Sequence, residues 1–134
     1  MYEDISRAIY ASKTHYTVLM GDFNAKLGAK QNDELRVGKF GIGQRNQRGQ
    51  LLVDFMEKEE LFMMNSFFRK QPQRKWTWSS PDGMTKNEID FILTTNRRLF
   101  NDVSVINRVK TGSDHRMVRG ILNFNIKLER SRLV

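Results

Sequence analysis

The sequence predicts a mixed α/β fold, and two features of its hydrophobic pattern indicate this class. Apolar residues recur at helical spacing in two separate segments, residues 2–13 and 49–60. Short apolar runs rich in β-branched and aromatic residues, first at 16–20 and then repeatedly after residue 60, are typical of strands. The predicted order is therefore helix, strand, helix and several strands, without the spacing of a zinc finger or a helix-turn-helix.

The first predicted helix and strand follow one another closely. Ile5, Ala8 and Ile9 lie at positions i, i+3 and i+4, which predicts an amphipathic helix over residues 2–13. The run at 16–20 is short and apolar and stops at a Gly-Asp pair, which predicts a buried strand followed by a loop.

A long loop and a second helix come next. Residues 26–47 contain four glycines and scattered charges, which predict an irregular loop, and loops of that length are usually functional or disordered. A helix is predicted over 49–60. Its apolar face is formed by Leu51, Leu52, Phe55 and Met56.

The second half of the chain is predicted to be mostly strands. The apolar run 61–68 is a strand candidate, and residues 76–78 and 88–93 are predicted to form two strands joined by a turn at 81–83. Another short strand is predicted at 103–106. One face of the last strand carries Val118, Leu122, Phe124 and Ile126.

Composition narrows the class of partner. The 134 residues (15.8 kDa) fit one domain or part of one, and 23 Lys+Arg against 15 Asp+Glu give a net charge of +8. Residues 61–134 carry fourteen basic and six acidic side chains, so the whole net positive charge lies in that half. This favours a polyanion as the partner of that half. The chain has no cysteine, which excludes disulfides and thiolate sites, and no apolar run long enough for a membrane span. We expect an intracellular protein, without a membrane partner.

Asp22 and Asn24 directly follow the first predicted strand. If the chain stays extended here, side chains two residues apart point the same way. Both groups would then lie at the carboxyl end of a strand, where α/β sheets commonly bind ligands. The alternative is a turn, because Asp and Asn after glycine commonly bond their own backbone.

Asp90 and His115 form a second candidate pair. Asp90 is flanked by large apolar residues in the predicted strand 88–93, where an unpaired carboxylate is costly, so its partner must come from elsewhere. His115, in the connecting segment 112–116, is one of two histidines. Paired with Asp90, it would present an imidazolium to a phosphate oxygen. Asp114 would remain as a hard oxygen ligand for Mg²⁺ or Mn²⁺. The alternative is a turn whose polar side chains bond their own backbone.

Together these groups are the parts that phosphodiester hydrolysis requires: a base for water, a ligand for a divalent ion, and donors to the phosphate oxygens. They are Asp22, Asp114, Asn24 and His115. The basic second half would hold the rest of a nucleic acid strand.

Three motifs, in this order, resemble the endonuclease/exonuclease/phosphatase superfamily, which includes deoxyribonuclease I, apurinic endonucleases and the endonuclease domains of non-LTR retrotransposons. They are GDFNA at 21–25, NEIDFIL at 87–93 and SDH at 113–115. Four further segments are similar to RTE-type retrotransposon endonucleases and to host-domesticated relatives of the craniofacial development protein 2 type: 38–49, 67–69, 76–83 and 105–115. The resemblance covers residues 2–126.

The resemblance implies a four-layer α/β sandwich of the deoxyribonuclease I type, with the active site at the shared edge of two sheets. It also implies Mg²⁺-dependent cleavage of DNA. In this interpretation Asp22 activates or positions the attacking water and Asn24 binds the scissile phosphate. Asp114 assists metal binding, His115 contacts the phosphate and Asp90 pairs with His115.

A larger set of residues is expected to contact DNA. Asn46 lies in a loop that in relatives approaches the DNA backbone, and Trp78 corresponds to an aromatic residue near the rim of the site. Core packing is an equal alternative for Trp78. The expected DNA-binding residues are Asn46, Arg48, Arg74, Lys75, Trp78, Arg97 and Arg98.

The sequence departs from the superfamily in one large respect. The early Asn, the Glu that is the principal metal ligand, and the phosphate-binding Tyr have no counterpart here. We therefore expect residues 1–134 to form a single partial domain, the C-terminal half, with 127–134 as a loose tail. Such a half would leave one sheet face uncovered, which favours self-association.

Three functions follow from these expectations. The first is a nuclear, retrotransposon-derived endonuclease whose metal site is only partly present. The second is a catalytically inactive remnant that binds nucleic acid or protein. The third is a phosphatase that acts on small phosphoesters or lipids, which the basic surface disfavours.

Overall fold

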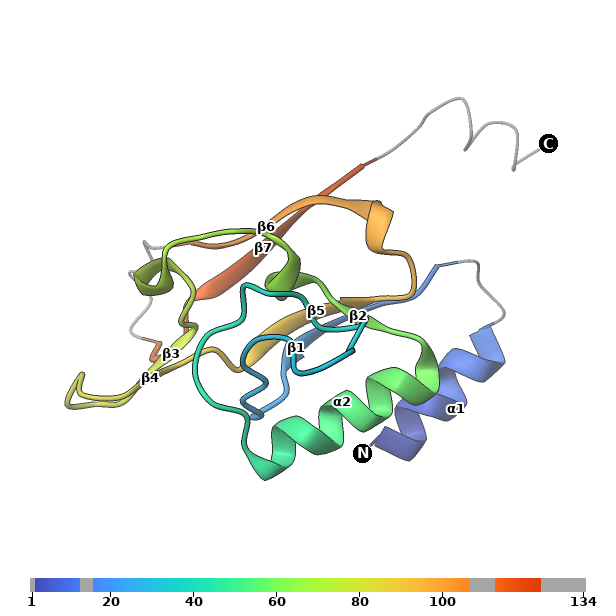
Figure 1. Cartoon of the computed structure of the whole chain (residues 1–134), viewed down its shortest axis with the longest axis horizontal. Coiled ribbons are helices and arrows are strands. Elements are labelled where there is room, and N and C mark those ends of the chain that lie inside the picture. Colours follow the sequence, from blue (N-terminus) through green and yellow to red (C-terminus); the bar gives the residue numbers. More distant parts are fainter. Residues whose placement is uncertain (1, 13–15, 107–112, 124–134) are drawn as a thin grey trace.

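Two helices, a central sheet and a β-hairpin form three layers in the computed structural model, which describes residues 2–12, 16–106 and 113–123 (Figure 1). Helices α1 (Tyr2–Ser12) and α2 (Gln47–Glu59) lie on one side of the sheet. Strands β6 (Phe100–Ile106) and β7 (Met117–Leu122) lie on the other side. The mixed α/β class is confirmed, and the described residues form three layers.

The central sheet has the order β1-β5-β2 and is antiparallel. Its strands are β1 (Val18–Asp22), β5 (Asp90–Thr94) and the two-residue β2 (Phe62–Met63). Because strand side chains alternate, Phe91 and Leu93 pack on the helices while Ile92 packs toward the β6–β7 hairpin. The register places the last residue of β1 opposite the first residue of β5.

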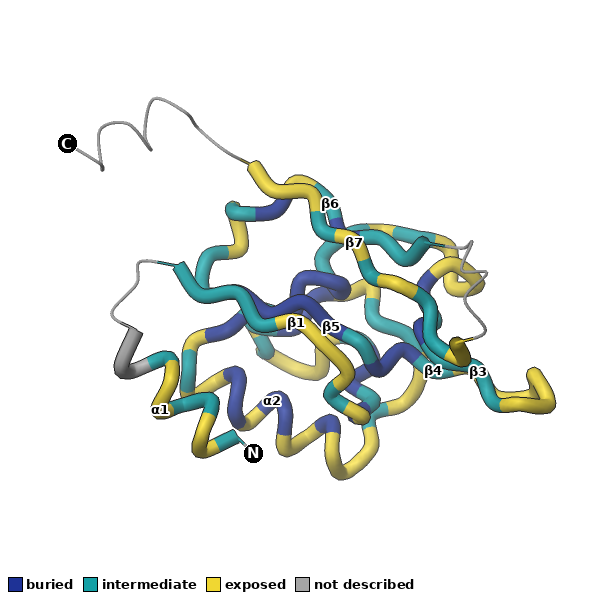
Figure 2. Tube along the Cα trace, turned by 180° about the vertical axis from the view of Figure 1, so that it is seen from behind, coloured by how far each residue is buried: buried dark blue, intermediate teal, exposed yellow. Residues whose placement is uncertain are grey.

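Helix α2 supplies most of the helical side of the core. Its buried side chains include Leu52 and Met56, and the tube of α2 in Figure 2 alternates between dark blue and yellow, as expected for a helix with one buried side. The prediction that Leu51 shares the buried face was wrong, because Leu51 points outward and is 55 % exposed. Asn46 caps the start of the helix, where its side chain accepts a hydrogen bond from the backbone N–H of Gly49, and Glu60 caps its end in a left-handed conformation.

The β6–β7 hairpin covers part of the other sheet face. Phe100 and Val103 of β6 form a second core cluster with Ile92 and Met64. Gly120 of β7 allows this close approach, since a Cβ there would lie 2.5 Å from the Phe100 ring. Part of the apolar surface expected from the sequence stays uncovered: Met20 in the middle of β1 is 71 % exposed, and Met117, Ile121 and Leu122 of β7 are 60 %, 44 % and 42 % exposed. Self-association through it stays a prediction.

Two predicted strands take other conformations. The segment 61–68 has only β2 as a strand and continues as the 3₁₀ helix η1 (Met64–Phe67). The predicted hairpin of 76–78 and 88–93 is instead formed by the short strands β3 (Trp78–Ser79) and β4 (Lys86–Asn87). β5 leaves that hairpin and joins the central sheet.

The remaining connections are loops and short 3₁₀ turns. The predicted loop 26–47 is confirmed except for its last residue, Gln47, which is the first residue of α2. Turn η2 (Pro72–Arg74) precedes β3, and η3 (Arg97–Leu99) joins β5 to β6. Phe124, Ile126 and the predicted tail 127–134 lie outside the described residues. Among the described helices, neither has the length and apolarity required to cross a bilayer.

Leu51 and Leu52 offer a matched test of this packing. Replacement of Leu52, which is fully buried, by Ala should lower the free energy of unfolding by about 2–5 kcal/mol. Leu51→Ala should change it by less than about 0.5 kcal/mol, because that side chain is exposed. The change in helix propensity is the same in both variants, since each replaces Leu by Ala in α2. Urea unfolding followed by circular dichroism measures both values. Equal losses in the two variants would contradict the described orientation of α2.

Candidate active site

Two carboxylates lie directly opposite each other at one end of the central sheet. Asp22 ends β1 and Asp90 begins β5, and the two residues are register partners. Their side chains share the sheet face that carries Ile92, since residues 90 and 92 are two positions apart on one strand. Like charges opposite each other on neighbouring strands are destabilising. This pair therefore requires a cation.

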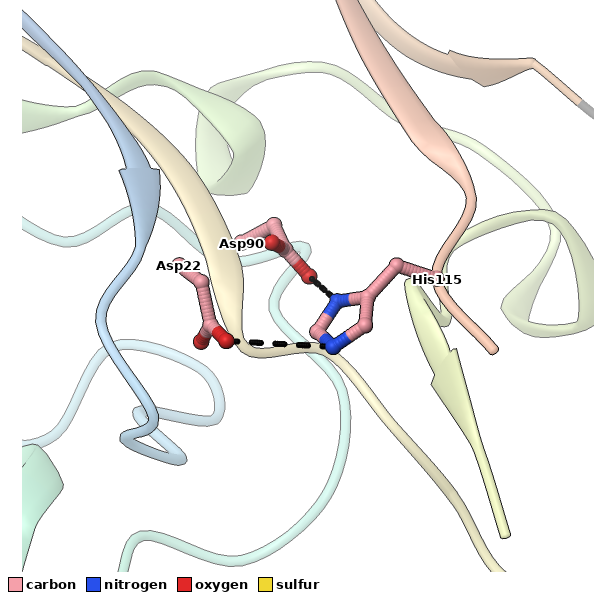
Figure 3. Close-up of side chains that lie close together, drawn as sticks. All are labelled: Asp22, Asp90 and His115. Carbon is pink, nitrogen blue, oxygen red and sulfur yellow. Dashed lines mark hydrogen bonds and ion pairs between the residues drawn. The ribbon is translucent and has the colours of Figure 1, made fainter. Parts of the chain in front are cut away.

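His115 supplies that cation from a segment just before β7. Its Nδ1 donates to Oδ2 of Asp90 at 2.9 Å, and its Nε2 lies 3.8 Å from Oδ2 of Asp22 (Figure 3). Figure 3 shows the three side chains, from β1, β5 and the segment just before β7, pointing toward one another. The predicted pairing of Asp90 with His115 is thus present in the structure.

The backbone around His115 is fixed by pairing with the region of β3. His115 and Trp78 form a β-bridge, Ser79 N–H donates to the carbonyl of Asp114 at 3.1 Å, and Arg116 N–H donates to the carbonyl of Thr77 at 2.7 Å. This pairing joins the short β3–β4 hairpin to the central sheet through the Asp90–His115 bond. His115 is therefore held from its backbone and from its ring.

The pKa of His115 is raised above its ordinary value. Burial alone lowers the pKa of this imidazole, but the hydrogen bond to Asp90 and the charges of Asp90, Asp22 and Asp114 together outweigh it. The imidazolium therefore persists to higher pH than in a histidine without these neighbours. Its Nε2–H faces outward, between the carboxylates of Asp22 and Asp114.

Two carboxylates remain available for a divalent cation. Oδ1 of Asp114 lies 3.8 Å from His115 Nε2, and its Oδ2 accepts a hydrogen bond from Trp78 Nε1 at 3.0 Å. The side chains of Asp22 and Asp114 are 46 % and 60 % exposed. Ligand atoms of Asp22, Asp90 and His115 all lie within 4.8 Å of one another. Hard, accessible oxygens suit Mg²⁺, which is commonly held by only one or two carboxylates together with water and substrate.

A polar hollow of about 380 Å³ opens beside these groups. Three of its lining residues, Lys26, Asn87 and Ile89, were not predicted as site residues. Asn87 lies at the start of the NEIDFIL motif, whereas no spacing in the sequence singles out Lys26. The lining residues are Asp22, Asn24, Lys26, Asn46, Trp78, Asn87, Ile89 and His115.

Asn24 does not continue the strand. Its φ is 48°, in the left-handed region, and its N–H donates to Oδ1 of Asp22 at 2.8 Å. The extended geometry expected for residues 22–24 was therefore wrong, and the turn that stood as its alternative is present. Both side chains nevertheless line the polar hollow.

The remaining predicted DNA contacts fall into two groups. Asn46 and Trp78 line the hollow, and Arg48 and Arg74 are exposed on α2 and η2. Asn46 also begins α2, and its Oδ1 accepts from the backbone N–H of Lys26 at 3.1 Å.

Arg97 and Arg98 lie away from the site. They follow the far end of β5, at least about 13 Å along the strand from Asp90. Arg97 lies over the ring of Phe67, with 5.1 Å from its Cζ to the ring centroid. The structure therefore does not bring these two arginines together with the Asp22 cluster.

The prediction that Lys75 contacts DNA was wrong. Lys75 is 3 % exposed, and its Nζ donates to the backbone carbonyl of Asn65 at 2.6 Å and lies 3.5 Å from Oε2 of Glu88. Glu88 is equally buried, and this burial raises its pKa to about 7 although Lys75 opposes the shift. Burial likewise lowers the pKa of Lys75.

Comparison with known proteins gives one family. A family model described as endonuclease-reverse transcriptase matches residues 1–119. Craniofacial development protein 2 of Tragulus javanicus is 33 % identical over 131 residues, which cover 96 % of this chain and 22 % of that protein. The protein of the same name from Bos taurus is 32 % identical, with the same coverage. The chain thus spans about a fifth of the length of these relatives. No solved structure matches it significantly.

The Asp90–His115 bond predicts the effect of a conservative substitution. Asp90→Asn should lower the pKa of His115, because the variant removes the carboxylate that stabilises the imidazolium and retains the burial that opposes it. A raised pKa in the folded state stabilises the fold at low pH, and this contribution is lost as pH rises through that pKa. Asp90→Asn should therefore lose more stability at pH 5 than at pH 9.

An NMR titration of the metal-free protein measures this pKa, and the chain has only two histidines to assign. Asp54→Asn, which removes an exposed carboxylate on α2, is the matched control. An unchanged His115 pKa in Asp90→Asn would show that the bond does not exist in solution.

Proposed function

This chain belongs to the endonuclease/exonuclease/phosphatase-like family, and from this premise we propose that it hydrolyses phosphodiester bonds in DNA. The observation that carries the proposal is the convergence of Asp22, Asp90 and His115 beside a polar hollow. These side chains come from positions 22, 90 and 115, and two of them are carboxylates that repel each other. Stability alone gives no reason to place them together.

The residues suggest a division of roles. Asp22 accepts the proton of a water molecule whose oxygen bonds to phosphorus, while one bridging P–O bond breaks and its oxygen takes a proton from solvent. His115 donates its Nε2–H to a non-bridging oxygen and stabilises the charge that develops there. Asp90 keeps the imidazole charged and oriented through Nδ1. The amide of Asn24, on the wall of the hollow, donates to the same phosphate.

Mg²⁺ or Mn²⁺ is the cofactor that these residues fit. Asp114 would be the protein ligand of the ion, completed by water and phosphate oxygens, since Asp90 is already committed to His115 and Asp22 serves as the base. The ion would neutralise charge on the phosphate oxygens and on the leaving oxygen. Carboxylate oxygens beside a protonated imidazole offer no nitrogen ligand, which favours a hard cation over zinc.

The cations and amides in and near the hollow support a nucleic acid as the substrate. Lys26 and Asn46 line it, and Arg48 and Arg74 are exposed on neighbouring elements. The net charge of +8 would add long-range attraction to a polyanion. We place such an activity in the nucleus and derive the chain from a retrotransposon endonuclease.

A plasmid-nicking assay tests the proposal. The purified chain with Mg²⁺ should convert supercoiled plasmid to the nicked form, and EDTA should stop it. Asp22→Asn and His115→Gln should each lower the rate by about 10²–10⁴-fold, because each removes a proton-transferring or phosphate-binding group. Asp54→Asn should nick at the wild-type rate, since its side chain is exposed on α2.

Equal nicking by all four proteins would indicate a contaminating nuclease and contradict the assignment. DNA binding that persists in EDTA and weakens steeply with salt, without nicking, would favour the inactive binding domain instead. Hydrolysis of small phosphoesters without nicking would favour the phosphatase alternative.

A further inference from the structure

The backbone of Asp90 is held by side chains where the β-sheet ladder ends. On the side of β2, the last paired residues are Met63 and Leu93. Beyond them Asn65, in η1, takes the place of a strand residue. Its Nδ2 donates to the carbonyl of Asp90 at 3.1 Å, and its Oδ1 accepts from the N–H of Ile92 at 2.9 Å.

Thr77 holds the other peptide group of Asp90. Its Oγ1 accepts from the N–H of Asp90 at 3.2 Å and from the N–H of Ile89 at 3.0 Å. Both side chains are buried, with Thr77 at 0 % and Asn65 at 3 % exposure. Because both side chains are buried, neither Asn65 nor Thr77 is a candidate to contact substrate. Both hydrogen-bond the backbone of Asp90, from two different segments of the chain.

We propose that Asn65 and Thr77 are positioning residues that hold the Asp90 carboxylate against Nδ1 of His115. The proposal rests on the proposed function for its catalytic consequence. Asp90 is the first residue of β5, and an end residue of a strand is free to fray unless its N–H and C=O are bonded. Two buried side chains replace the missing ladder here.

The buried Lys75–Glu88 pair fits this arrangement. Lys75 Nζ donates to the carbonyl of Asn65, so it fixes the backbone from which the amide reaches Asp90. Glu88, its ionic partner, lies two residues before Asp90 in the chain. Burying an ion pair contributes little to stability on its own, so its effect on geometry is a better reason for its presence.

The orientation of the Asn65 amide follows from its partners. A flipped amide would place its oxygen against the Asp90 carbonyl and its NH₂ against the Ile92 N–H, losing both bonds. One rotamer therefore satisfies both strand groups. Replacement by a smaller side chain leaves two buried backbone groups unpaired and lets Asp90 move.

The test reads the tautomer of His115 in protein labelled with ¹⁵N-histidine, at a pH above the end point of its own titration, where the imidazole is neutral. Wild-type His115 should carry its proton on Nδ1, because the other atom of that bond is a carboxylate oxygen. Asn65→Ala and Thr77→Val should each shift the proton toward Nε2. Thr77→Ser, which keeps the hydroxyl, should restore the wild-type spectrum.

Ser66→Ala is the matched control. Ser66 is the buried neighbour of Asn65, and its hydroxyl also bonds two backbone groups, Gly38 N–H at 2.7 Å and the Met63 carbonyl at 2.6 Å. Neither group belongs to β5. This variant should lose comparable stability and keep the Nδ1–H tautomer.

A wild-type tautomer in folded Asn65→Ala and Thr77→Val would overturn the proposal, and so would an equal shift in Ser66→Ala. If Asn65→Ala does not fold, the Thr77→Val and Thr77→Ser pair decides. Where wild type nicks DNA, the two positioning variants should do so about 10–100-fold more slowly. A shifted tautomer with an inactive wild type would uphold the positioning role and reject the proposed function.

Discussion

The interaction on which the site depends is the repulsion between Asp22 and Asp90, which face each other across neighbouring antiparallel strands. Two carboxylates at that separation are tolerated only with a cation between or beside them. His115 provides it from a segment outside the central sheet, where its backbone forms a β-bridge with Trp78. Because His115 neutralises this strand pair, it also connects the central sheet to the β3 region and to the segment just before β7.

The same arrangement separates structural from chemical tasks. Asp90 faces inward and is bonded to Nδ1 of the imidazole, whereas the carboxylates of Asp22 and Asp114 are exposed on the Nε2 side of the ring. One carboxylate fixes the charge and orientation of His115, and two remain for water or a cation. Behind Asp90, a buried polar layer formed by Asn65, Thr77, Lys75 and Glu88 replaces the end of the sheet ladder. Polar burial of that kind is costly for any group left unbonded, and Oε2 of Glu88 is held only by its 3.5 Å ion pair with Lys75.

The sequence pattern predicted features that depend on neighbouring residues. It failed to predict features that depend on contacts with residues distant in the sequence. The two-residue alternation was enough to place Asp90 and Ile92 on one strand face, and the need of Asp90 for a partner pointed to His115. The burial of Lys75 could not be predicted, because its partners Asn65 and Glu88 are ten or more positions away. In the segment 61–68 the mostly apolar run, interrupted by Asn65 and Ser66, fits a buried strand and a buried 3₁₀ turn equally. Asn65 then bonds β5 through its side chain rather than its backbone.

The most direct test of the account is where a paramagnetic divalent ion binds. Substoichiometric Mn²⁺ added to the ¹⁵N-labelled chain should broaden the amide signals of residues 22–24 and 113–115 first, because the carboxylates of Asp22 and Asp114 lie there with His115 between them. The double variant Asp22→Asn/Asp114→Asn should lose this broadening while keeping its fold. Broadening confined to other acidic groups, such as those at the end of α2, or broadening unchanged in the double variant, would contradict the assignment of this cluster as a metal-dependent active site.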